Sequence, residues 1–118
     1  MRTRSTNQED YLLRLIKEAA AALRLLKHRL AGTDGSPDAI REQAAAAVRA
    51  LLGPRAQLLE RVDAGSAVHL VGHREHVELW AALLEVEADA THRTGDATSA
   101  ARLSARAIEL REAALVLP

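Results

Sequence analysis

The stretch THRTGDATSAARLSARAIEL, residues 91–110, decides the fold of this chain. Gly95 suits the left-handed conformation at the end of one helix, and Asp96 suits the N-cap of the next. Small side chains follow the turn, at Ala100, Ala101, Ser104 and Ala107. Helices that present small residues to one another can approach closely. The stretch therefore predicts a helical hairpin over about 74–117, with its helices at 74–94 and 97–115.

A longer amphipathic helix is predicted at the N-terminus. Thr6 and Glu9 have the spacing of a capping box, in which each side chain satisfies a backbone donor of the other. Apolar residues then recur three and four positions apart on one helical face, at Leu12, Ile16, Ala19, Leu23, Leu26 and Leu30. We expect this stripe to lie mostly in the core. Its near-heptad spacing also suits the seam of a homodimer.

Proline and glycine divide the middle of the chain. Ser36–Pro37 is a typical N-cap with proline at the first helical position, and Gly53–Pro54 ends the helix that follows. Two shorter helices are predicted after it, over 55–62 and 66–71, the second capped by Ser66. Gly72 is expected to end that second helix.

The pattern as a whole predicts an all-α protein. No segment shows the period-two alternation of a half-buried strand. The length of 118 residues fits one domain, covering 1–118, with four to five helices in an array or bundle. Alanine is abundant and buries little area per residue, so the core is expected to be thin and tight.

Composition excludes several classes of function. Sixteen basic residues balance sixteen acidic ones, and only 2% of residues are aromatic, which argues against a nucleic-acid binder. The absence of cysteine excludes disulfides, thiolate metal sites and thiol catalysis, and it fits a reducing cytoplasm. No apolar run is long enough to span a bilayer, and no signal peptide is visible. We therefore expect a soluble, cytoplasmic protein without nucleic-acid or membrane partners.

The last third of the chain resembles one tetratricopeptide-type helical hairpin. Ala88, Gly95, Ala100 and Ala107 stand at matching offsets, and the segment ends in ARAIEL. Ser104 replaces the aromatic residue usual in the second helix, and Trp80 lies slightly early for the usual tryptophan. Only one such copy is present, whereas repeat architectures normally need about three. The resemblance implies a tetratricopeptide-like end and not a superhelix.

The whole chain is similar to a family of short all-helical bacterial proteins of unknown function, which open with an Asp-Tyr-x-Leu-Arg-x-Ile pattern. The residues that match this opening are Asp10, Tyr11, Leu13, Arg14 and Ile16. The family resemblance implies an all-α fold with a tetratricopeptide-like C-terminal hairpin. It implies no reaction and no functional residues.

Histidines offer a possible metal site. His69, His73 and His76 follow one another at spacings of four and three, which could place imidazoles on one face of a continuous helix for Zn²⁺ or Ni²⁺. Gly72 is expected to break that helix and separate the histidines. The plainer interpretation is a polar helix start with histidines near the surface.

No catalytic constellation is visible. The carboxylate pairs Glu85–Asp89 and Glu109–Glu112 lie on predicted solvent faces beside arginines, where solvated ion pairing is their ordinary role. No serine has a nucleophile context, and no phosphate-binding loop is present. We expect a protein that is not an enzyme and needs no cofactor.

Two aromatic residues and one apolar stripe are the best candidates for contacts with a partner. Tyr11 and Trp80 are expected to anchor a partner if apolar surface is exposed, although Trp80 would otherwise fill the core. Arg102 and Arg106 share a helical face and could form a basic patch for an acidic peptide, or a solvated face. The sequence thus favours a helical interaction or scaffold module that self-associates, with these candidate contacts: Tyr11, Leu12, Ile16, Leu23, Trp80, Arg102 and Arg106. Metal or small-ligand binding near His69–His76 is the alternative.

Overall fold

The computed structural model describes residues 3–32 and 35–118. Four long helices are joined by two short ones and a 3-10 turn, and no strand occurs in these residues. The elements in chain order are α1 (Thr3–Ala31), α2 (Pro37–Leu52), η1 (Gly53–Arg55), α3 (Ala56–Arg61), α4 (Ala64–Val71), α5 (Arg74–Arg93) and α6 (Ala97–Ala114). The predicted all-α fold is confirmed.

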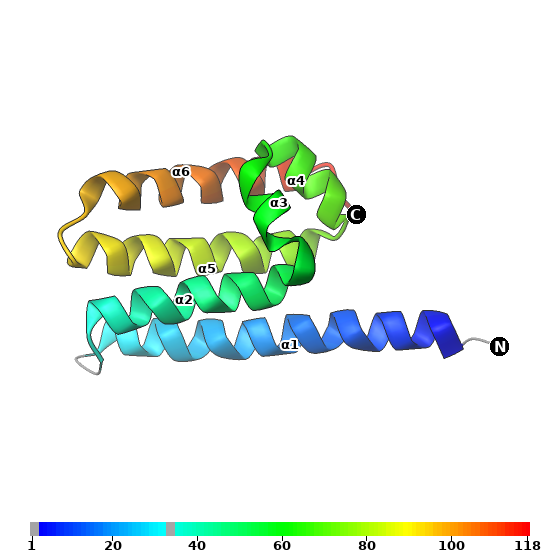
Figure 1. The fold of residues 1–118 in the computed structure, drawn as a ribbon, viewed down its shortest axis with the longest axis horizontal. Coiled ribbons are helices and arrows are strands. Elements are labelled where there is room, and N and C mark those ends of the chain that lie inside the picture. Colours follow the sequence, from blue (N-terminus) through cyan, green and yellow to red (C-terminus); the bar gives the residue numbers. More distant parts are fainter. Residues whose placement is uncertain (1–2, 33–34) are drawn as a thin grey trace.

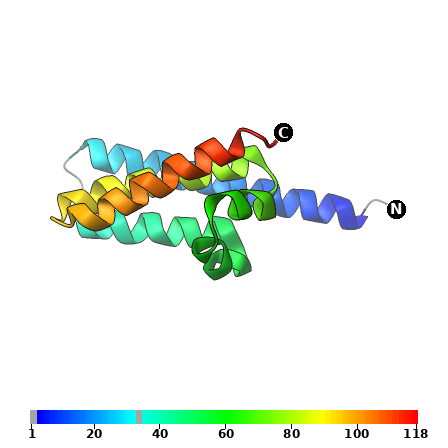
Figure 2. The ribbon, with the colours of Figure 1, turned by 90° about the horizontal axis from the view of Figure 1, so that it is seen from above.

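The long helices form two antiparallel pairs that pack against each other. Figure 1 shows α1 beside α2, and α5 beside α6, with the second pair stacked on the first. Helix α5 contacts α1, α2, α4 and α6, so it forms the centre of the structure. The short helix α4 packs against one end of α6, and α3 joins it to the end of α2 (Figure 2). Helix α1 lies at the edge, and its N-terminal turns extend past the other long helices in both views.

Side-chain caps fix the starts of α2 and α6 where the sequence predicts them. The Ser36 hydroxyl accepts a hydrogen bond from the Ala39 amide at 3.1 Å, and the Asp96 carboxylate accepts one from the Ser99 amide at 3.0 Å. Gly95 has a φ of 98°, which side-chain-bearing residues rarely adopt, so the predicted turn at 95–96 is confirmed.

Two predicted helix starts are wrong. Helix α4 is capped by Asp63, whose carboxylate accepts from the Ser66 amide at 3.0 Å, so it begins at Ala64 and Ser66 lies in its first turn. Aspartate caps a helix as well as serine does, so Asp63 and Ser66 were both candidates for the N-cap of this helix. Helix α1 begins at Thr3, ahead of the expected start at Thr6. The side chain of Thr6 lies outside the described residues.

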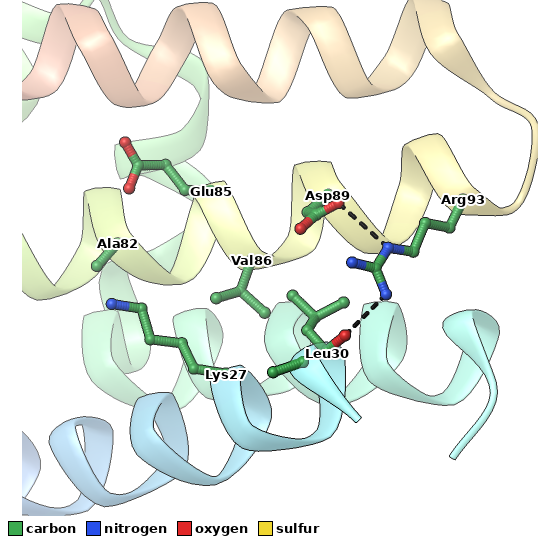
Figure 3. Close-up of a pocket in the computed structure, with 8 residues that line it drawn as sticks. Lys27, Leu30, Ala82, Glu85, Val86, Asp89 and Arg93 are labelled. Atoms are coloured by element: carbon green, nitrogen blue, oxygen red, sulfur yellow. Dashed lines mark hydrogen bonds and ion pairs between the residues drawn. The ribbon is translucent and has the colours of Figure 1, made fainter. Parts of the chain in front are cut away.

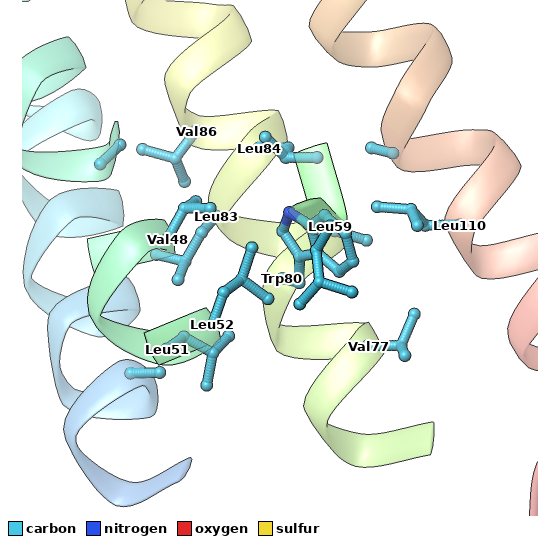
Figure 4. Packing of buried hydrophobic residues seen from close by; sticks show 14 of the residues in the cluster. Val48, Leu51, Leu52, Leu59, Val77, Trp80, Leu83, Leu84, Val86 and Leu110 are labelled. Atoms are coloured by element: carbon cyan, nitrogen blue, oxygen red, sulfur yellow. The ribbon is translucent and has the colours of Figure 1, made fainter. Parts of the chain in front are cut away.

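Trp80 lies at the centre of the core, with 1% of its surface exposed. It is surrounded by aliphatic side chains from four elements, as Figure 4 shows, among them Val48, Leu52, Leu59, Val77, Leu83, Leu84 and Leu110. Ala100 and Ala107 are buried on the inner face of α6, where their size allows close packing with α5. Ala101 and Ser104 are exposed, so only half of the small residues predicted to face inward do so.

Candidate interaction surface

The apolar stripe of α1 is buried at one end of the helix and open at the other. Towards the C-terminal end, Leu26 and Leu30 are 3% and 8% exposed. Towards the N-terminal end, Tyr11, Leu12, Leu13 and Ile16 are half-buried or exposed, and we call these four residues the α1 ridge. Tyr11 is 44% exposed and Leu13 is 53% exposed. The ridge is therefore a short apolar surface without a partner helix within the described chain.

The end of α2 limits how far the ridge is covered, because Tyr11 and Leu12 lie beside Leu51, Leu52 and Gly53 at the last turn of α2. Gly53 adopts a φ of 69°, which turns the chain away from α1 after Leu52 and into η1. A side chain at Gly53 would be strained by this φ, and its Cβ would approach the Tyr11 hydroxyl at 3.8 Å. Helix α1 continues past this turn, so its N-terminal turns have no α2 beside them (Figure 1).

Two hollows flank the ridge. One, of about 270 Å³, lies on the Tyr11 side between α1, the end of α2 and η1. The other, of about 410 Å³, lies on the Leu13 side between α1 and the start of α5. Leu12, His73 and His76 line both of them. Apolar side chains flanked by open hollows are typical of surfaces that bind another protein segment.

His76 forms the floor between the two hollows. Its side chain is buried, and its Nε2 lies 2.9 Å from the carbonyl oxygen of Leu51. Because a carbonyl oxygen only accepts, Nε2 must carry the hydrogen in this contact. Burial lowers the pKa of His76, and the hydrogen bond to Leu51 opposes that effect in part. His76 thus ties the start of α5 to the end of α2 and is not a free ligand.

The structure separates the three histidines of the predicted metal site. His69 is exposed on α4, and His73 is exposed at the residue before α5. Gly72, with a φ of 80°, ends α4 between them as predicted. Within residues 3–32 and 35–118, no three His, Cys, Asp or Glu side chains lie close enough together to hold a metal ion.

Trp80 and Arg106 are not part of an exposed surface. Trp80 is in the core, so the alternative that it fills the core is confirmed and its role as an exposed anchor is wrong. Arg106 donates hydrogen bonds of 2.8 Å to the carbonyl oxygens of Leu59 and Val62. Arg102 is exposed, and Arg106 is half-buried. The sequence could not show that Arg106 turns inward, because its carbonyl partners lie more than 40 residues away.

Arg93 ties α5 to the C-terminal end of α1. Its Nη1 donates to the carbonyl oxygen of Leu30 at 2.9 Å, and its Nε lies 3.4 Å from the Asp89 carboxylate (Figure 3). The adjoining hollow, of about 320 Å³, is lined by charged side chains from α1 and α5. Arg93 therefore holds one end of α1 in place, opposite to the ridge.

The carboxylates considered for catalysis are engaged in structural ion pairs or exposed. Glu85 pairs with Arg111, and Asp89 pairs with Arg93. Glu109 and Glu112 are exposed on α6. Such pairs are solvated and hold helices together weakly.

One further carboxyl group, Glu87, is affected by burial. It lines a hollow of about 310 Å³ between α2, α3, α5 and α6, with Glu60 and Arg49. Burial raises the pKa of Glu87, the negative charge of Glu60 raises it further, and Arg49 partly opposes both effects. At neutral pH this carboxylate is therefore held in an unfavourable environment.

Of the residues predicted to contact a partner, the ridge brings together Tyr11, Leu12 and Ile16. Leu23 packs against the core two turns further along. Leu13 is a ridge residue that the stripe analysis did not select, because it lies off the core-facing stripe.

Comparison with known proteins adds no relative. The chain matches no protein-family model, no curated protein and no solved structure. Among the described residues, no helix is both long and apolar enough to cross a bilayer.

Proposed function

We propose that this chain is a non-enzymatic helical interaction or scaffold module whose docking surface is the α1 ridge. The observation that supports this most is Leu13, an apolar side chain left 53% exposed beside the 410 Å³ hollow. Burying Leu13 together with Leu12 and Ile16 in a partner would remove apolar surface from water, at about 25 cal/mol per Å². Exposed charges around the ridge would fix the register of the partner.

The resemblances noted in the sequence are consistent with this role. The α5–α6 pair has its small residues Ala88, Ala100 and Ala107 buried, as a tetratricopeptide-like hairpin requires. We propose that this hairpin acts as the rigid base on which α1 is carried. The matches to the short bacterial family, Asp10 to Ile16, fall on and beside the ridge. The lack of cysteine fits a function in the reducing cytoplasm.

A site-specific photocrosslinker tests the docking surface. A benzophenone amino acid at Leu13, introduced in cells that make the protein, is expected to yield discrete protein adducts. The same residue at Ser104, exposed on α6, is the matched control and is expected to yield few. Equal labelling at both positions, or no protein adduct at Leu13, would show that the ridge is not a docking surface.

Metal or small-ligand binding is the alternative function. Its support is that His73 and His76 line the same 410 Å³ hollow as Glu75. Titration calorimetry with Zn²⁺ and Ni²⁺ tests it. Stoichiometric, sub-micromolar binding that disappears in both His73→Ala and His76→Ala would favour this alternative over protein docking.

A further inference from the structure

A second apolar stripe runs along α1 beside the core-facing one. Leu13, Ile16, Ala20 and Leu23 follow at spacings of three, four and three, which are the a and d positions of a heptad. Leu13 is exposed, and the other three are half-buried. Such a stripe is the seam along which one helix packs against another. Leu23 packs against the core and Ile16 lies beside the start of α5, so the part of the stripe open to a second helix is its Leu13 end.

Charges on the same side of α1 are divided by sign. Glu9 and Asp10 are exposed at the N-terminal end of the stripe, and Lys17 and Arg24 are exposed further along. Within the part of the chain that the structure describes, none of these four side chains forms an ion pair. The stripe therefore carries an acidic end and a basic end that are both unneutralised.

The acidic and basic ends of two α1 helices face each other only when the two helices are antiparallel. If two copies of α1 pack antiparallel about a two-fold axis, Leu13 of each faces Ile16 of the other. Heptad geometry then places Asp10 of one copy beside Lys17 of the other, twice by symmetry. Parallel packing would set acid against acid and base against base, which costs free energy. The partner that best fits the stripe is thus the stripe itself.

The surroundings of the stripe leave room for a second helix. The 410 Å³ hollow beside Leu13 is bounded by α1 and the start of α5 alone. The N-terminal turns of α1, which precede the stripe, extend past the other long helices (Figures 1 and 2).

We propose that two copies of this chain form a dimer through antiparallel pairing of their α1 helices, with Leu13 and Ile16 at its centre and Asp10 opposite Lys17. This rests on the proposed function and names the partner as a second copy. A short seam of this kind is expected to dissociate in about the micromolar range.

Light scattering coupled to size exclusion, from about 1 to 100 μM, measures the association. The chain of 12.7 kDa is expected to approach twice that mass at the upper concentrations. Leu13→Glu is expected to weaken the dimer at least about 100-fold, because two carboxylates would enter the seam. Leu25→Glu is the matched control, since Leu25 is 51% exposed on another face of α1 and should leave the dimer intact. Circular dichroism should show both variants equally folded.

A charge exchange tests the orientation independently. Asp10→Lys is expected to weaken the dimer and the double variant Asp10→Lys with Lys17→Asp to restore it. In the cysteine-free background, a mixture of Asp10→Cys and Lys17→Cys chains is expected to form the mixed disulfide on mild oxidation. Asp10→Cys alone should crosslink poorly, because the two copies of residue 10 lie at opposite ends of the seam. Efficient crosslinking of Asp10→Cys alone would overturn the antiparallel arrangement.

Three results separate failure of the proposed dimer from failure of the docking function on which it rests. A monomeric mass at every concentration, with Leu13 crosslinked to a different protein, would overturn the self-pairing and leave the docking surface standing. A monomeric mass with no adduct at Leu13 would overturn both. A dimer that Leu13→Glu leaves unchanged would place self-association on another surface and overturn the α1 seam.

Discussion

The guanidinium group of Arg106 lies over the indole ring of Trp80, with its central carbon 5.7 Å from the ring centroid. The same group donates to the carbonyl oxygens of Leu59 and Val62, at the C-terminal end of α3. These carbonyls have few partners within so short a helix. One side chain on α6 therefore holds α3 against α5.

Arg106→Ala is expected to destabilise the protein by about 2–3 kcal/mol. It would leave two carbonyl groups without a donor and remove the cation over Trp80. Arg102→Ala, four residues earlier and exposed, should change stability by less than about 0.5 kcal/mol. Urea unfolding followed by circular dichroism measures both. Equal stabilities for the two variants would show that the Arg106 contacts carry no net free energy.

Ala107→Leu is expected to destabilise the fold by about 1–3 kcal/mol, because Ala107 is fully buried on the inner face of α6 and the added carbons would separate α6 from α5. Ala105→Leu makes the same substitution at an exposed position of the same helix. The melting temperatures of both variants are measured. The exposed variant reports the effect of helix propensity alone, so the difference between the two reports the effect of packing. A similar melting temperature for the two would contradict close packing at Ala107.

His76 makes stability depend on pH. Its pKa in the folded protein lies below the ordinary value of 6.5, so the unfolded chain binds a proton more readily. Its contribution is therefore complete above pH 6.5 and is lost as the pH falls towards the folded pKa. His76→Gln, which keeps an N–H donor, is expected to flatten the fall in stability below pH 6.5. His69→Gln, at an exposed position, should keep the wild-type pH profile.

Glu87 makes the stability of the fold depend on pH in the direction opposite to His76. Its pKa is raised above the ordinary value of 4.5, so its cost to stability is absent at low pH and appears as the pH rises through the folded pKa. Glu87→Gln is expected to raise the melting temperature at pH 7 and to lose that advantage near pH 4. Glu60→Gln should give a smaller gain that is not additive with it, since each removes the same repulsion. A gain that persists unchanged at pH 4 would point to packing instead.

Local signals made most of the fold predictable. Ser36, Gly72, Gly95 and Asp96 mark helix ends by their own backbone and side-chain chemistry, and each acts there as expected. Periodicity likewise placed the C-terminal half of the α1 stripe in the core. These features depend on residues only a few positions apart, which a sequence shows directly.

The features that the sequence did not predict depend on contacts between residues far apart in the chain. Arg106 and Arg93 turn towards carbonyl oxygens 47 and 63 residues away, respectively, and no local pattern reveals such partners. The ridge is also a tertiary feature, because Tyr11 and Leu12 lie beside the last turn of α2 while Leu13 lies beside the start of α5. The spacing of apolar residues assigns Leu12 and Leu26 to the same stripe, although only the side chain of Leu26 is buried.

The central position of α5 has a consequence for synthesis of the chain. Trp80, Leu83 and Leu110, three of the most completely buried large side chains, lie in α5 and α6. Helices α1 and α2 therefore emerge from the ribosome before the surface that covers them exists. The α5–α6 hairpin, closed by a turn of a few residues, has a shorter loop to close than the α1–α2 pair. We expect it to fold first and the nascent N-terminal helices to dock onto it last.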